Sequence, residues 1–363
     1  METTTTSGLE GVVVADTRLS EVDGERGRLV VAGHDIERLA DRATFEDVAA
    51  LLWTGALPDA DGRAAQQRAL AEGRVAAFER LGGLGDALAR VDGMDALRAA
   101  TGHLSADDGF DAPARLAGAL AVFAAAWLRV RGGARPIAPD PRCSHAEDLL
   151  RMIGWLEATP ARVAGLAAYL VTVADHGMNA STFAARVVTS TGSDGVSAVV
   201  AAIGALKGPL HGGAPGPVLD MLDAVGHPEH AAAWIDGELA AGRRIMGMGH
   251  RIYRVRDPRA AVLERAIARL EQAGISTGRL ALARAVERAA EGALRSKYPG
   301  RPLAANVEFY TAVLLDTLGI DRAAFSPIFA VGRVAGWYAH VLEQRAIGRL
   351  IRPASRYVGP TPA

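Results

Sequence analysis

Two histidines and one glutamate stand where glycine and polar residues interrupt otherwise apolar stretches of the chain. They are His211 in residues 207–217, His250 in residues 244–259 and Glu308 in residues 302–310. Glycine weakens helices and strands, so its presence there indicates unusual backbone angles or the close approach of a ligand. An imidazole can donate a hydrogen bond or transfer a proton near neutral pH, and a carboxylate can act as a base. The three segments are therefore the candidates for an active site.

The second of these segments, residues 244–259, is the most specific indication of an active site. Gly247 and Gly249 expose backbone N–H groups beside the imidazole, and Arg259 follows at the start of the next apolar stretch. The histidine of the first segment, His211, is a weak signal alone, because a lone histidine in a glycine-rich turn is usually structural. Glu308 has two interpretations. Burial raises the pKa of a carboxylate and suits a general base, whereas a glutamate in the first turn of a helix is stabilised by the helix dipole.

Helices must position these groups, because apolar residues recur at helical spacing over most of the chain. The predicted helices cover residues 45–57, 62–83, 112–130, 146–157, 161–175, 195–206, 228–241, 258–273, 280–298 and 325–350. Strand signals are confined to residues 11–15 and 28–32, which predict a small N-terminal β-hairpin. We therefore expect a mainly α fold.

Length and composition narrow the function further. A chain of 363 residues exceeds the size of one typical core, which predicts two domains. The net charge is −1 and the basic residues are scattered, which argues against nucleic-acid binding. Cys143 is the single cysteine, so no intrachain disulfide can form and a reducing compartment fits. The longest apolar run, residues 116–128, is too short to span a bilayer and is typical of a buried helix. We expect a cytoplasmic protein with no membrane partner.

In this order and spacing, the three segments resemble those of the citrate synthase family. The resemblance extends over nearly the whole chain, through residues 11–36, 44–58, 175–183, 333–337 and 352–359. It implies a two-domain helical fold. The large domain would comprise residues 1–212 and 317–363, and residues 213–316 would form a small domain that closes over the active site.

The resemblance also implies the reaction, which joins acetyl-CoA to oxaloacetate and releases citrate and CoA after hydrolysis. His211 matches the histidine that donates a hydrogen bond to the thioester oxygen as an enolate forms. Glu308 matches the general base that removes the methyl proton. His250 matches the histidine that polarises the ketone and protonates the new alkoxide.

Further positions match the binding residues of the family. The resemblance assigns the dicarboxylate to His176, Asn179, Arg259, Arg333 and Arg352, and CoA to Ile245, Gly247, Gly249, Arg254 and Asn306. In the family the arginine at the position of Arg352 reaches into the neighbouring subunit's site, which implies a homodimer. No permanently bound cofactor and no metal are expected, and acetyl-CoA or another acyl-CoA serves as co-substrate.

The departure from the family pattern that matters most is Glu308, because the family base is normally aspartate. One extra methylene displaces the carboxylate by about 1 Å, and a misplacement of that size can slow a reaction about 10²-fold. Two alternatives therefore stay open beside citrate synthase: a 2-methylcitrate synthase that uses propionyl-CoA, or a non-catalytic paralogue that binds ligands. A metal site formed by His211, His227 and His230 is a weaker hypothesis, since the last two look like the exposed start of a helix.

Overall fold

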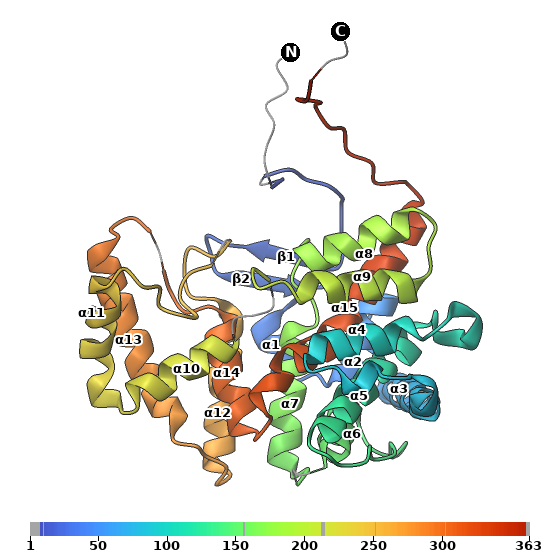
Figure 1. Ribbon diagram of the computed structural model, residues 1–363, viewed down its shortest axis with the longest axis horizontal. Helices are drawn as coiled ribbons and strands as arrows, with labels where there is room; N and C mark the ends of the chain where they lie inside the picture. Colours follow the sequence, from blue (N-terminus) through green and yellow to red (C-terminus); the bar gives the residue numbers. More distant parts are fainter. Residues whose placement is uncertain are drawn as a thin grey trace.

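A computed structural model describes residues 8–9, 11–154, 157–211, 215–250, 252–301 and 303–360. Residues 212–214, 251 and 302, which belong to the three glycine-rich segments, lie outside this description. The body of the molecule is built of helices, with a small sheet near the N-terminus (Figure 1). The predicted mainly α fold is confirmed.

The N-terminal sheet has one more strand than the predicted hairpin. Strands β1 (Ser20–Asp23), β2 (Arg28–Val31) and β3 (His34–Asp35) are antiparallel in the order β1-β2-β3, with Ser20 opposite Val31. The prediction of a strand at residues 28–32 is confirmed, but that at residues 11–15 is wrong. Residues 20–23 pair with β2 instead, because only the short turn at residues 24–27 brings two extended segments side by side. Residues 11–15 pair with no strand of the described part of the chain.

The helices follow the predicted order. Their bounds are α1 (Ile36–Ala40), α2 (Phe45–Thr54), α3 (Ala60–Glu79), α4 (Gly93–Gly102), α5 (Pro113–Arg131), α6 (His145–Ile153), α7 (Pro160–Val173), α8 (Ala180–Ser190), α9 (Gly195–Leu206), α10 (Pro215–Val225), α11 (Ala231–Ala240), α12 (Pro258–Gln272), α13 (Arg279–Lys297), α14 (Val307–Thr317) and α15 (Phe325–Ile347). Helices α1, α4, α8, α10 and α14 lie outside the predicted ranges. Of these, α1, α4, α8 and α14 each begin at a side chain that accepts a backbone N–H of the first turn, namely Asp35, Asp92, Asn179 and Asn306. Such N-caps mark a helix start that periodicity does not show.

Helix α5 forms the centre of the large hydrophobic core. It is long and apolar enough to cross a membrane, but 72% of its apolar window is buried inside the protein. All side chains of residues 116–128 are buried, and the helix packs on α3, α4, α6 and α15. The prediction of a buried helix here is therefore confirmed.

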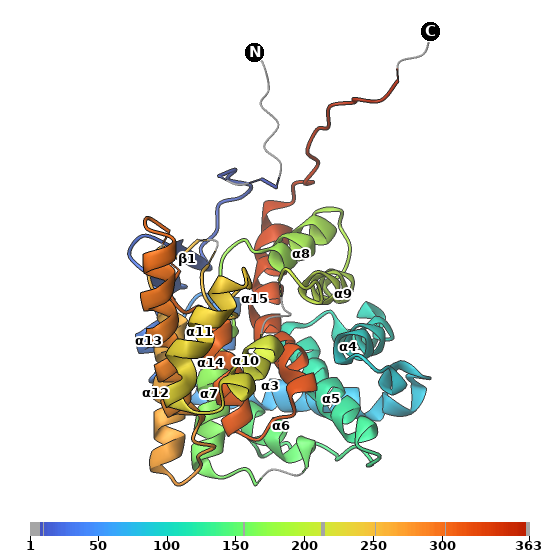
Figure 2. The ribbon, with the colours of Figure 1, turned by 60° about the vertical axis from the view of Figure 1, so that its left-hand side comes forward.

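Helix α15 runs through the middle of the molecule, as Figures 1 and 2 show, and contacts α2, α5, α7, α8 and α9. Its glycines let it approach the C-terminal end of α7 closely. The Gly336 N–H donates to the Ala174 carbonyl at 3.1 Å, so two backbones touch where most helices would be separated by side chains. This contact fixes the start of the segment that follows α7.

We predict that Gly336→Ala destabilises the protein by about 1–3 kcal/mol, the usual cost of overpacking. A methyl group at Gly336 would overlap the Ala174 carbonyl oxygen and lie 2.6 Å from Asp175 Oδ1. Gly204→Ala in α9 is the matched control, because it meets open space and should stabilise by about 0.5–1 kcal/mol. Urea unfolding of both variants measures the difference. Equal stability of the two variants would contradict the prediction.

Candidate active site

The candidate site is organised around the turn that connects α7 to α8. The Arg333 Nε–H donates to the Val173 carbonyl, and Gly336 bonds to the next residue, as described above. His176 follows within this turn and is only 7% exposed. Helix α15 therefore presents Arg333 to the site and holds the backbone that carries His176.

Two of the predicted histidines lie side by side. The ring centroids of His176 and His250 are 5.6 Å apart, and both rings contact Tyr253. The Tyr253 hydroxyl lies 3.1 Å from His176 Nε2. The structure thus brings together one predicted catalytic residue and one predicted substrate-binding residue from segments more than 70 residues apart.

The hydrogen bonds of His250 fix the position of its proton. Its Nδ1 accepts the backbone N–H groups of Ile252 at 3.0 Å and Tyr253 at 3.1 Å. Neutral imidazole has one acceptor and one donor nitrogen, so Nε2 carries the proton. Burial, and then the charge of Arg259, lower the pKa of His250 to about 4. Near neutral pH this residue is an uncharged Nε2–H donor.

His211 has the opposite tautomer. The backbone N–H of Ser181 donates to His211 Nε2 at 3.3 Å, and the Ser181 hydroxyl lies 2.7 Å from the same atom. Because Nε2 accepts, the proton of the neutral ring lies on Nδ1. Trp337 Nε1–H donates to the Ser181 hydroxyl at 3.0 Å, which ties this histidine to α15. Burial, and then Arg333, lower the pKa of His211 to about 4.

Glu308 is the second residue of α14. It therefore lies in the first turn of a helix and, at the same time, among the candidate site residues. The Asn306 side chain caps the helix by accepting the Glu308 N–H at 3.0 Å. The carboxylate atom Oε2 is shielded from solvent and has no hydrogen-bond partner among the described residues. Burial raises the pKa of Glu308 to about 7, against the opposing charges of Arg259 and Arg333. A carboxylate in this state is a stronger base than one in water.

The two buried arginines differ in their partners. Arg259, 3% exposed, forms two parallel bonds to Asp257, with Nη2–Oδ2 at 2.7 Å and Nε–Oδ1 at 3.0 Å. Arg333 is 1% exposed and forms no ion pair with a carboxylate of the described residues. Burial lowers the pKa of Arg333 to about 10, so it remains charged near neutral pH. A buried cation that forms no ion pair within the described residues is suited to an anionic ligand.

The predicted CoA segment forms a tight turn against the start of α14. Gly247 and Gly249 have φ angles of +73° and +84°, which side chains other than glycine rarely adopt. The Gly249 N–H donates to the Ala304 carbonyl at 2.8 Å, and Asn306 Nδ2 donates to the Gly249 carbonyl at 2.9 Å. Ile245, which precedes this turn, is buried. The turn therefore joins the His250 and Glu308 segments through backbone contacts.

Three predicted residues have other surroundings. Asn179 caps α8 by accepting the Thr182 N–H at 3.1 Å. Arg254 is exposed, and its backbone N–H donates to the Gly24 carbonyl at 2.9 Å. Arg352 is exposed on the C-terminal tail, which leaves the body of the molecule beyond α15 (Figure 1). The structure does not bring Arg352 to the site of its own chain.

Four residues outside the predicted site hold these groups in place. Ser181 and Trp337 orient His211, Tyr253 contacts both other histidines, and Asp257 accepts the Val307 N–H at 3.2 Å while it pairs with Arg259. Asp257 was recognisable as an N-cap before proline. Ser181, Trp337 and Tyr253 act through contacts with residues far away in the sequence, and no local sequence pattern predicts such contacts.

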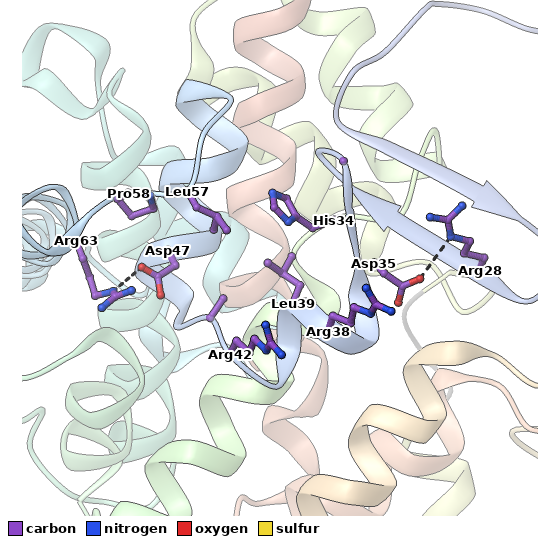
Figure 3. A pocket seen from close by; sticks show the side chains of 12 residues that line it. Arg28, His34, Asp35, Arg38, Leu39, Arg42, Asp47, Leu57, Pro58 and Arg63 are labelled. Atoms are coloured by element: carbon purple, nitrogen blue, oxygen red, sulfur yellow. Dashed lines mark hydrogen bonds and ion pairs between the residues drawn. The ribbon is translucent and has the colours of Figure 1, made fainter.

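Other candidate sites lie apart from this cluster. Within the described residues no group of three or more potential metal ligands occurs, and His227 and His230 are exposed. A pocket of about 540 Å³ lies among β2, β3, α1 and the start of α3 (Figure 3). Ion pairs to Asp35 and Asp47 hold two of its arginines, and none of the predicted catalytic residues lines it.

Comparison with known proteins gives consistent matches. The family model described as "Citrate synthase, C-terminal domain" matches residues 8–354. The citrate synthase of Haloferax volcanii is 39% identical, over 97% of this chain and 95% of its own length. The 2-methylcitrate synthase of Mycobacterium tuberculosis is also 39% identical, over 97% of this chain and 90% of its own.

Solved structures agree with these relatives. Citrate synthase from Thermotoga maritima superimposes with a TM-score of 0.85 at 34% identity, covering 98% of this chain and 96% of that one. The ternary complex of the Thermoplasma acidophilum citrate synthase with carboxymethyl coenzyme A and oxaloacetate gives 0.87 at 28% identity, with the same coverage.

Glu308 should make stability depend on pH. The folded carboxyl has a pKa of about 7 against an ordinary value of 4.5, so the unfolded chain loses this proton at lower pH. Its contribution to the free energy of unfolding therefore falls as pH rises from about 4.5 to about 7, and then stays constant. We predict that Glu308→Gln gains stability relative to the wild type over this window. Urea unfolding at about pH 5 and about pH 8 tests this, and an unchanged difference between the proteins would refute it.

Proposed function

The chain belongs to the citrate synthase family, and from this membership we propose that it condenses acetyl-CoA with oxaloacetate and hydrolyses the product to citrate and CoA. One observation carries the assignment of its base: Glu308 Oε2 is shielded and has no hydrogen-bond partner among the described residues, and burial raises the pKa of this carboxyl group to about 7. Two neutral histidines and two buried arginines complete the set of groups that the reaction needs.

The first step is removal of a proton from the methyl group of acetyl-CoA. Glu308 takes this proton, and the electron pair of the broken C–H bond moves toward the thioester oxygen. His211 donates its Nδ1–H to that oxygen and so stabilises the enolate. A donor placed in this way is typically worth about 3–4 kcal/mol. Ser181 supports the role, because its backbone N–H keeps the His211 proton on Nδ1.

The second step forms the carbon–carbon bond. The enolate carbon attacks the ketone carbon of oxaloacetate, and the ketone oxygen becomes an alkoxide. His250 polarises the ketone with its Nε2–H and protonates the alkoxide, and the proton that Glu308 took from the methyl group then restores the Nε2–H of His250. A neutral imidazole is suited to this because its proton points away from the two backbone N–H groups at Nδ1. Water then hydrolyses the thioester and CoA leaves as the thiol.

The carboxylates of oxaloacetate require cations. We assign them to Arg333, which has no internal ion pair among the described residues, and to Arg259, with His176 and Asn179 beside them. The Thermoplasma relative binds a CoA analogue and oxaloacetate, which supports the same ligand classes here. CoA would contact Ile245, Gly247, Gly249, Arg254 and Asn306. Acetyl-CoA is a co-substrate, and no permanently bound cofactor is assigned.

Relatives of both names match this chain, so the acyl group needs a separate argument. Curated citrate synthases from several organisms match over nearly its full length, and this favours acetyl-CoA over the propionyl-CoA alternative. The non-catalytic alternative is disfavoured because both histidines keep defined tautomers and the base remains a shielded carboxylate.

We also propose a domain organisation, an oligomeric state and a cellular location for the protein. Residues 213–316 would act as a small domain that closes on the rest of the chain, which exposes the site for binding and then excludes water. Two chains would form a homodimer in which the exposed tail places Arg352 in the partner's site. A cytoplasmic location fits the single free cysteine, Cys143.

Purified protein with oxaloacetate and acetyl-CoA should release free thiol, and Glu308→Gln should reduce the rate by about 10²-fold or more. Because the carboxylate form is needed, kcat/KM should fall about tenfold per pH unit below the Glu308 pKa of about 7. Glu308→Asp keeps a carboxylate, although in a shifted position, and is the control that should stay more active than Glu308→Gln and keep the same direction of pH dependence. If the wild type releases no thiol with any acyl-CoA, the proposed reaction is wrong.

Mixing two inactive variants tests the dimer. Arg352→Ala damages the partner's site, whereas His250→Ala damages the site of its own chain. A heterodimer would then hold one site with both lesions and one intact site. Dissociating and reassociating an equal mixture should restore about a quarter of wild-type activity. Absence of recovery, with heterodimers present by native mass spectrometry, would contradict the shared site.

A further inference from the structure

A buried chain of polar side chains lies behind the proposed oxaloacetate site. Asp175, directly before His176 in sequence, is completely buried. His340 of α15 places its Nε2 3.3 Å from Asp175 Oδ1, and Arg186 of α8 places its Nη1 3.0 Å from His340 Nδ1. Both of these residues are also completely buried. None of the three has a role in the reaction described above.

The contact with arginine fixes how the imidazole is protonated. A guanidinium only donates hydrogen bonds, so His340 Nδ1 must accept, and the proton of the neutral ring lies on Nε2. The Nε2–H therefore faces the Asp175 carboxylate. Arg186 forms its own ion pair with Glu343, at 2.6 Å, and not with Asp175. The imidazole of His340 is thus the link between the carboxylate and the arginine.

The inner end of this chain holds the backbone of the turn. Asp175 Oδ2 accepts the Ser20 hydroxyl at 2.5 Å, and the same hydroxyl accepts the Gly177 N–H at 2.7 Å. These bonds hold the backbone immediately before and after His176. The outer end is closed by the N-terminal segment, because Glu343 accepts the Arg18 N–H at 2.9 Å.

The polar atoms at the contact between Asp175 and His340 have no alternative hydrogen-bond partners among the described residues. Asp175 Oδ1 and His340 Nε2 face each other at 3.3 Å, shielded from solvent, and neither atom has a hydrogen-bond partner among the described residues. Burial alone would raise the pKa of Asp175, but His340, Arg333 and Ser20 together hold it below its ordinary value. The buried carboxylate therefore depends on its neighbours, and removal of one of them should move it and the turn attached to it.

We propose that His340 and Arg186 are positioning residues that fix the His176 turn through Asp175 and thereby set the affinity for oxaloacetate. The inference rests on the proposed function, in which His176 contacts that substrate. Glu308 and His211 carry the proton transfer at the other substrate, so loss of the network should weaken oxaloacetate binding and leave kcat at saturation nearly unchanged.

The experiment compares two substitutions of His340. His340→Leu removes both polar contacts, whereas His340→Gln offers a carbonyl that can accept from Arg186 and an amide that can donate to Asp175. Calorimetric titration should find the oxaloacetate Kd raised about tenfold or more in the leucine variant and within about threefold of wild type in the glutamine variant. Backbone exchange at Gly177 should be faster in the leucine variant only.

His145→Leu is a matched control. His145 is also completely buried, with Nδ1 3.2 Å from Arg74, which pairs with buried Asp148 at 2.6 Å. The same kind of cluster therefore stands at α6, with no contact to the site residues described above. This variant should lose stability while oxaloacetate Kd and Gly177 exchange stay at wild-type values.

The outcomes separate the two hypotheses. A wild-type protein that does not bind oxaloacetate would reject the proposed function, whatever the variants do. A wild type that binds, together with a folded leucine variant of equal Kd, would reject the positioning role alone, as would equal weakening by glutamine and leucine. If His340→Leu fails to fold, Ser20→Ala decides, since it removes the hydroxyl that donates to Asp175 and accepts the Gly177 N–H. An unchanged Kd in that variant would overturn the inference.

Discussion

The close contact between α15 and the end of α7 is the constraint on which the site depends. The missing side chain of Gly336 lets the helix touch the Ala174 carbonyl. From that contact, successive turns of α15 present Arg333 to the site, Trp337 to the serine that orients His211, and His340 to Asp175. One buried helix face therefore sets the position of groups that come from distant parts of the chain.

Burial of charge is the second principle of the site. Within the described part of the chain, Arg333 is enclosed without an ion pair, and Glu308 Oε2 has no hydrogen-bond partner. Both arrangements cost stability in the free protein. They persist because the extensive apolar core around α5 and α15 offsets them. In the proposed reaction, the anionic substrate would pair with Arg333 and the proton of the methyl group would pass to Glu308.

Several features were predictable because they depend on local sequence. The helices over residues 195–206 and 258–272 follow from apolar spacing and an aspartate cap, and the glycines at 247 and 249 mark a turn with positive φ angles. The N-terminal hairpin was half predicted. Strand β2 has a clear β-branched pattern in the sequence. Its pairing partner depended on the length of the turn before it, which places residues 20–23 beside β2.

The sequence by itself determined which chemical groups are present: two histidines and a carboxylate in glycine-rich segments, and arginines of the kind that a dianionic substrate would need. It also determined the mainly helical fold through its periodicity. Only the tertiary structure decided their state. The tautomers of His211 and His250 depend on backbone N–H groups that fold against them, and the raised pKa of Glu308 depends on its burial. The link from Asp175 to His340 joins residues 165 positions apart, so no local pattern could reveal it.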